Sequence, residues 1–104
     1  MQDKVYAVSA EIVRIIEETV RESMAPFGFT SLRVRGGEDH DGDPVIFIDA
    51  DYGLSENPIG TGVTSALITR LSDRLWEAGE TRFPHIRHHF DERQEFMPFR
   101  RKRA

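Results

Sequence analysis

The 104-residue chain contains no cysteine. This absence excludes a disulfide scaffold, a zinc site built on thiolates and a cysteine nucleophile. It suits a reducing compartment, and we expect a cytoplasmic protein. The opening segment "MQDKVYAVSAEIVRII" mixes charges among its apolar residues, so we expect no signal peptide. No apolar run approaches the roughly 20 residues that a membrane-spanning helix needs, so we expect no membrane partner.

Positive charge is scarce outside the C-terminal end of the chain. The sequence has 14 Lys and Arg against 18 Asp and Glu, for a formal net charge of −4. Four of these cations stand together in "FRRKRA": Arg100, Arg101, Lys102 and Arg103. The acidic remainder argues against a general nucleic-acid surface, because phosphate contacts need clustered cations. We expect a single domain over residues 1–95 and a basic tail over residues 96–104, since this length suits one core.

Apolar residues at steps of three and four predict two amphipathic helices. The first helix is expected over about residues 3–25, with Asp3 or Ser9 as its N-cap and the breaker "APFGF" at its end. Its apolar stripe is Val5, Val8, Ile12, Ile15, Ile16 and Val20. The second helix is expected over about residues 62–79, with Gly79 just past its end. Its stripe is Leu67, Leu71, Leu75 and Ala78.

Three segments have the patterns of β-strands. "TSLRVR", residues 30–35, alternates between apolar and charged side chains, which is typical of a half-exposed strand. "PVIFIDADY", residues 44–52, contains a continuous apolar run, which is typical of a central strand. The polar, glycine-rich segment between them predicts an antiparallel hairpin. Alternation in "HIRHHF", residues 85–90, predicts a short third strand.

These elements predict an α+β fold in the order α-β-β-α-(β). We expect a two-layer sandwich, with two helices packed on one face of a small antiparallel sheet. A small sheet leaves strand edges exposed, which favours a homodimer. The order is similar in topology to small nucleic-acid-binding α+β modules, but topology alone does not carry function. The best-known module of this kind places a Gly-x-x-Gly loop between two helices, and no such loop occurs in this chain.

"HIRHHFDE", residues 85–92, has the residue types of a metal or acid–base site. Imidazoles can bind a divalent metal, and carboxylates can complete such a site. On a strand, however, His85 and His89 point one way and His88 the other. Asp49 and Asp51 also share one strand face. We therefore predict no cofactor, with a divalent metal held by these three histidines and two aspartates as the alternative.

"EDHDGD", residues 38–43, alternates acidic residues in the manner of a calcium-binding loop. The pattern then fails, because Pro44 stands where such a loop has glycine and Ala50 where it has a bidentate glutamate. Aspartate and glycine are also typical turn residues. We interpret the segment as the turn of the hairpin.

No complete catalytic constellation appears in the sequence, so we favour a non-enzymatic role. Our leading hypothesis is an accessory or protein-interaction domain that self-associates as a homodimer or binds an unidentified protein. The first alternative is a nucleic-acid-associated domain that uses Arg33, Arg35 and the tail cations Arg100, Arg101, Lys102 and Arg103. The second is a metal-dependent enzyme with a site of histidine and aspartate.

Overall fold

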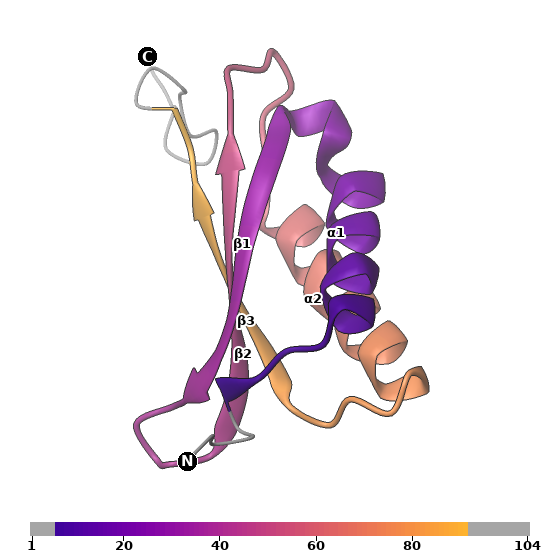
Figure 1. The fold of residues 1–104 in the computed structure, drawn as a ribbon. Coiled ribbons are helices and arrows are strands. Elements are labelled where there is room, and N and C mark those ends of the chain that lie inside the picture. The colour runs from indigo at the N-terminus through magenta and orange to yellow at the C-terminus, as the bar shows by residue number, and fades with distance from the viewer. Residues whose placement is uncertain (1–5, 92–104) are drawn as a thin grey trace.

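The computed structural model describes residues 6–91. Two helices and three strands follow one another in the expected α-β-β-α-β order (Figure 1). Their bounds are α1, Ala10–Met24; β1, Phe29–Glu38; β2, Pro44–Tyr52; α2, Thr61–Glu77; and β3, Phe83–His89, with a short 3-10 turn, η2, at Ala25–Phe27. The predicted α+β fold class is therefore confirmed. No helix in this part of the chain is long and apolar enough to cross a membrane.

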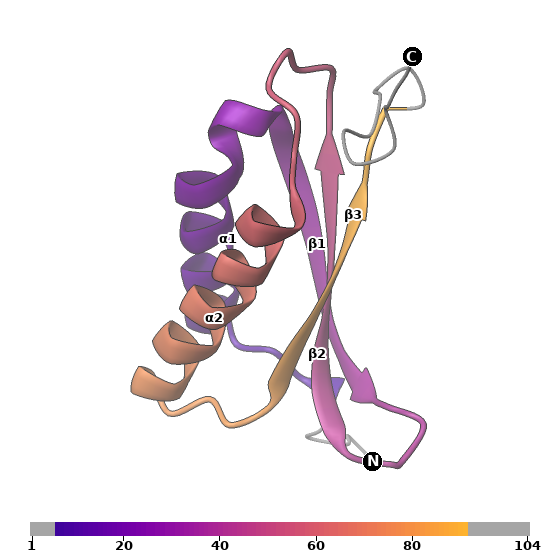
Figure 2. The same ribbon diagram turned by 180° about the vertical axis from the view of Figure 1, so that it is seen from behind.

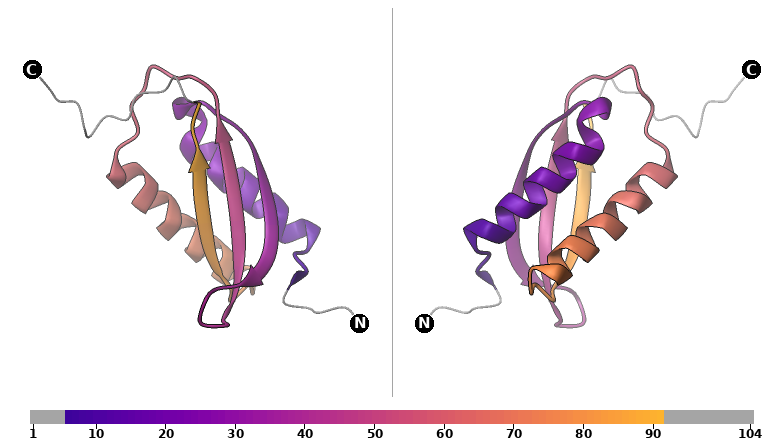
Figure 3. Two further views of the ribbon diagram at one scale, coloured as in Figure 1. Left: turned by 90° about the vertical axis from the view of Figure 1, so that its left-hand side faces the viewer. Right: turned by 90° about the vertical axis from the view of Figure 1, so that its right-hand side faces the viewer.

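Both helices pack on the same face of the sheet, and the opposite face carries neither of them (Figures 1 and 3). Alternation along β2 divides its side chains between the two faces. Ile46, Ile48 and Ala50 point toward the helices and are buried in the core. The helices contribute the complementary half of this core, chiefly Ile16, Val20, Met24, Leu67, Leu71 and Leu75.

The sheet has the order β1-β2-β3 and is mixed rather than wholly antiparallel. Strands β1 and β2 form the expected antiparallel hairpin, whereas β2 and β3 run parallel. A parallel neighbour requires a long crossover between the two strands, and α2 provides it. Figure 2 shows the chain leaving the end of β2, descending through α2 and entering β3 at the opposite end of the sheet.

The element ends differ from the expected ones for local reasons. Helix α1 begins at Ala10 rather than near residue 3, because the Ser9 hydroxyl caps it by accepting a hydrogen bond from the Ile12 amide at 3.2 Å. Expected helical residues 3–5, and the tail beyond Asp91, lie outside the described residues. Strand β1 continues through two glycines to Glu38, so that the hairpin turn is short. Gly79 adopts the left-handed conformation just past α2, as predicted.

Gly28 joins the helical layer to the sheet. Its φ is +91°, and an added Cβ would lie 2.7 Å from the carbonyl oxygen of Gly53. The Gly28 carbonyl also accepts a hydrogen bond from the Gly53 amide at 2.8 Å, which ties the start of β1 to the residue after β2. Only glycine combines this backbone conformation with this close approach.

We therefore expect Gly28→Ala to lower the free energy of unfolding by about 1–3 kcal/mol, through a strained backbone and a clash with an immobile carbonyl. Urea unfolding followed by circular dichroism measures this change. Gly62→Ala is the control, because it places a methyl group in open space within α2. Equal stabilities of the two variants would contradict the role given to Gly28.

Candidate functional site

The face of the sheet turned away from the helices, here called the open face, gathers charged and aromatic side chains from all three strands. The register places the positions of β1 opposite those of β2, and those of β2 opposite β3, in level rows. From the hairpin end upward, these rows are Gly37–Val45–Phe83, Arg35–Phe47–His85, Arg33–Asp49–Arg87 and Ser31–Asp51–His89. Residues far apart in the sequence, such as Arg33 and Arg87, thereby lie on one surface.

Four residues nearest the hairpin end form what we call the aromatic row. The Arg35 guanidinium carbon lies 4.4 Å from the centre of the Phe47 ring, a cation–π contact. The Phe47 and His85 ring centres are 5.8 Å apart, and those of His85 and Phe83 are 5.3 Å apart. Gly37 makes room for the row, because a Cβ at this position would lie 2.7 Å from the Phe47 ring. The rings therefore form a nearly continuous strip, with half of Phe83 exposed to solvent.

The next two levels of the open face hold an ion network. Asp49 is only 9% exposed, yet its Oδ1 accepts a hydrogen bond from His89 Nε2 at 2.8 Å and lies 3.3 Å from Arg87 Nε. The His89 hydrogen bond, supported by the nearby Arg87 charge, lowers the pKa of Asp49 against the opposing effect of its burial. Arg33 forms a separate ion pair with Asp51 at 2.8 Å. These contacts leave spare N–H donors on both arginines.

The residues of the hypothetical metal site are divided by the fold. His89 contacts Asp49, as the hypothesis requires. His85 belongs to the aromatic row, and His88 points to the helix side, where Tyr52 binds it. Within residues 6–91, no three imidazole or carboxylate groups are placed to share a metal ion. The metal alternative stays a prediction, and a shift of the melting temperature on adding Zn²⁺ would test it.

Tyr52 and His88 form a polar pair on the opposite side of the sheet. The Tyr52 hydroxyl lies 2.7 Å from His88 Nδ1, and the two rings are 5.5 Å apart. Burial raises the pKa of the Tyr52 hydroxyl and lowers the pKa of the His88 imidazole, so both groups stay neutral. This hydrogen bond satisfies two polar groups at the edge of the core. We assign the pair a structural role.

Only some of the residues predicted to contact nucleic acid lie in the part of the chain that the structure describes. Arg33 and Arg35 both stand on the open face, whereas Arg100, Arg101, Lys102 and Arg103 lie outside the described residues. Sequence reasoning did not add Arg87, Phe47 and Phe83 to this set. Alternation within β2 and β3 indicates which face of its own strand each of these residues occupies. It does not indicate that the two strands are neighbours in the sheet.

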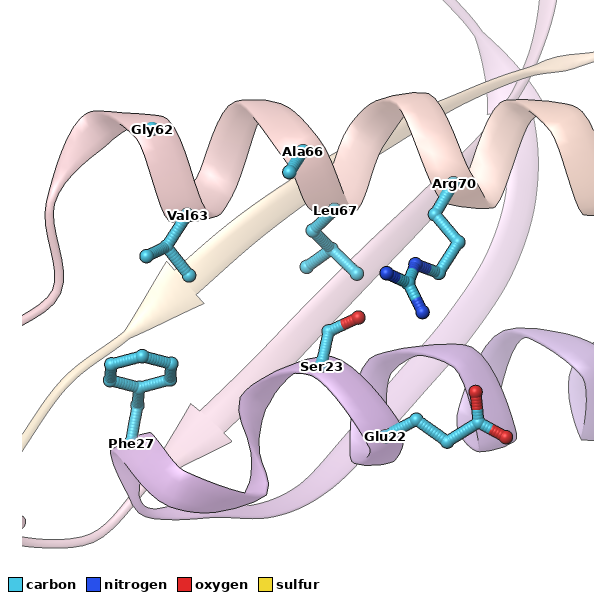
Figure 4. A pocket seen from close by; sticks show the side chains of 8 residues that line it. All are labelled: Glu22, Ser23, Phe27, Gly62, Val63, Ala66, Leu67 and Arg70. Carbon is cyan, nitrogen blue, oxygen red and sulfur yellow. The ribbon is translucent and has the colours of Figure 1, made fainter.

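The helical layer carries a second concave surface, an open groove of about 480 Å³ between α1 and α2 (Figure 4). Phe27 and Val63 face each other at one end of the groove, and Leu67 lies along its floor. Arg70 points across it toward α1. The groove holds no cluster of chemically reactive side chains within the described residues.

The Tyr52–His88 pair predicts that the free energy of unfolding depends on pH. Because the pKa of His88 is lower in the folded state than its ordinary value of 6.5, the unfolded state binds the proton first as the pH falls. This contribution to stability is therefore complete above about pH 6.5 and decreases below it. We expect His88→Gln to reduce the loss of stability between pH 7.5 and 5.5, measured as the change in urea midpoint. An unchanged pH dependence would contradict the burial of a neutral imidazole.

No protein-family model matches the chain, and comparisons with curated proteins and with solved structures give no match either.

Proposed function

We propose that the protein is a non-enzymatic binding domain that holds single-stranded nucleic acid on the open face of its sheet. The observation that carries this proposal is the aromatic row together with the three arginines in and beside it, which come from two different strands. Arg35 lies within the row, and Arg33 and Arg87 flank Asp49 one level away. Exposed rings and nearby cations are the two components that single-stranded nucleic acid requires.

The rings supply a stacking surface that suits unpaired bases. Every base has a π-face, so stacking on Phe47, His85 or Phe83 is available to any sequence. An uncovered sheet with aromatic side chains on its strands is also the arrangement by which one common RNA-binding module stacks two or three bases. Arg35 covers one side of the Phe47 ring in the free protein. A base that enters there exchanges one stacking partner for another, and the guanidinium stays near enough to reach a phosphate.

The arginines supply phosphate contacts despite the acidic composition of the chain. Arg33 and Arg87 are about two-thirds exposed. Each is anchored by one carboxylate through part of its five-donor fork, which leaves donors for a phosphate. The acidic residues concentrate elsewhere, on α1 and in the turn between β1 and β2. On the open face itself three arginines stand against two carboxylates, Asp49 and Asp51, so a small excess of positive charge remains there for counterion release to favour binding.

The open face is less suited to pairing with a second copy of itself. A two-fold dimer places the same patch on both subunits, so this face would bring two sets of arginines together. Its exposed part is also dominated by Arg and His rather than by a large apolar surface. An anionic ligand neutralises the excess of three arginines over two carboxylates on this face, whereas a symmetric partner adds to that excess.

Self-association remains a second candidate function through other surfaces. Trp76, on α2, is 70% exposed, and tryptophan is enriched at the centres of protein interfaces. Strands β1 and β3 each have only one neighbour in the described sheet, so both offer edges for pairing. A homodimer joined at Trp76 or at an edge is compatible with an unobstructed open face.

A cytoplasmic location likewise stays our prediction, from the cysteine-free sequence.

Fluorescence anisotropy with a labelled 12-nucleotide single strand tests the leading proposal. We expect salt-sensitive binding by the full chain, weakened at least fivefold by Phe47→Leu, which keeps apolar volume but removes the stacking surface. The double change Arg33→Ala with Arg87→Ala should reduce both the affinity and the slope of affinity against salt.

Arg14→Ala is the matched control, since it removes an exposed arginine from α1, away from the sheet. Affinity should be unchanged in this variant. A Phe47→Leu variant as tight as Arg14→Ala would overturn the proposal. So would binding that depends wholly on residues 100–104 and not on the open face.

Light scattering after size-exclusion chromatography tests the second candidate. If Trp76 lies at a dimer interface, the wild type has twice the mass of the chain and Trp76→Ser shifts it toward the monomer, because removing a buried tryptophan costs several kcal/mol. Tyr6→Ser is a control at another exposed ring. A wild type that is monomeric at all concentrations would contradict self-association.

A further inference from the structure

A pocket of about 380 Å³ adjoins the aromatic row at the hairpin end of the sheet. Its walls come from the turn after β1, the start of β2 and the start of β3. Phe83 and His85 belong both to this pocket and to the row, so a base stacked on either ring has its edge at the mouth of the pocket. Val45 forms part of the apolar wall.

The polar groups of the pocket are unequally available to a ligand. Arg82 is held by Glu80, with its Nε 2.8 Å and its Nη2 2.9 Å from the two carboxylate oxygens. Asp39 uses its Oδ1 to accept hydrogen bonds from the Asp41 and Asp43 amides, each at 2.9 Å. Among the described residues, the Asp43 carboxylate makes no hydrogen bond or ion pair. Of the two carboxylates that line the pocket, Asp43 is thus the one left open to a ligand, and it is a hydrogen-bond acceptor beside two exposed rings.

We propose that this pocket selects the base stacked on Phe83 and His85, and that it favours cytosine over uracil or thymine. This inference rests on the proposed function. A carboxylate accepts a hydrogen bond from the exocyclic N4 amino group of cytosine, and this is a recognised base contact of aspartate and glutamate. Uracil and thymine present a carbonyl oxygen at the same position, which would face the Asp43 carboxylate as a second acceptor. Ring size and stacking are nearly the same in all three bases, so the amino group decides the preference.

The acidic turn also orients the strand. Phosphates are repelled by the carboxylates of residues 38–43 and attracted by Arg33 and Arg87, one level beyond the row. A bound nucleotide therefore lies with its phosphate toward these arginines and its base toward the pocket. The acidic residues of this turn repel phosphates, but a carboxylate among them can accept a hydrogen bond from a base and so discriminate between bases.

The test compares labelled oligo(C) and oligo(U) 12-mers of the same backbone, measured by anisotropy with the full chain. We expect wild type to bind oligo(C) about tenfold more tightly, in line with one good hydrogen bond against an acceptor clash. Asp43→Asn, whose amide can donate to uracil as well as accept from cytosine, should bring the ratio close to one. Asp41→Asn is the matched control: it removes the same charge from the same turn but does not line the pocket, and its ratio should stay at the wild-type value.

The outcomes separate this inference from the function on which it rests. Equal binding of the two oligonucleotides by wild type, with affinity still lost in Phe47→Leu, overturns the selectivity and leaves the binding surface intact. Absence of binding to both overturns both proposals. An equal loss of the ratio in Asp41→Asn and Asp43→Asn assigns the preference to general charge and overturns the hydrogen bond. The wild-type ratio needs no variant, so a poorly folded Asp43→Asn does not prevent the decision.

Discussion

The central strand β2 meets the helices with one set of side chains and solvent with the other. Ile46, Ile48 and Ala50 form the floor of the core, while Phe47 and Asp49 lie between them in sequence and face the opposite way. Because the strand period is two, neither set can change faces without moving the other. The packing of the helices therefore determines the register of the sheet, and the register determines what the open face displays.

This arrangement places the nearly buried carboxylate of Asp49 in the middle of the open face. Asp49 requires partners there, because an unpaired buried charge is costly. His89 and Arg87, from the neighbouring strand, provide them. The ion network thereby links β3 to β2 and fixes the position of the Arg87 guanidinium beside the aromatic row. Stability and binding are connected at this point, since the contacts that satisfy Asp49 also position a cation for a ligand.

Sequence patterns were sufficient for the elements and for the faces of individual strands. The separation of His88 from His85 and His89, and the common face of Asp49 and Asp51, follow from alternation alone. The approach of His89 to Asp49 does not, because it depends on β3 lying parallel to β2 in one particular register. That register is determined by the crossover through α2, which is tertiary structure. Gly36 and Gly37 were expected between the strands for a similar reason: they belong to β1 because they pair with Ile46 and Val45 of the next strand, and Gly37 lies where a Cβ would meet the Phe47 ring.

The open face as a binding surface is tested most directly by backbone amide chemical shifts of the ¹⁵N-labelled full chain during titration with an unlabelled cytidine-rich 12-mer. The largest changes should fall on residues 33–37, 45–49 and 83–87, with helices α1 and α2 little affected. Saturable shifts confined to the groove between α1 and α2, or shifts limited to residues 100–104, would contradict the assignment. A spectrum that does not change at low salt would contradict nucleic-acid binding altogether.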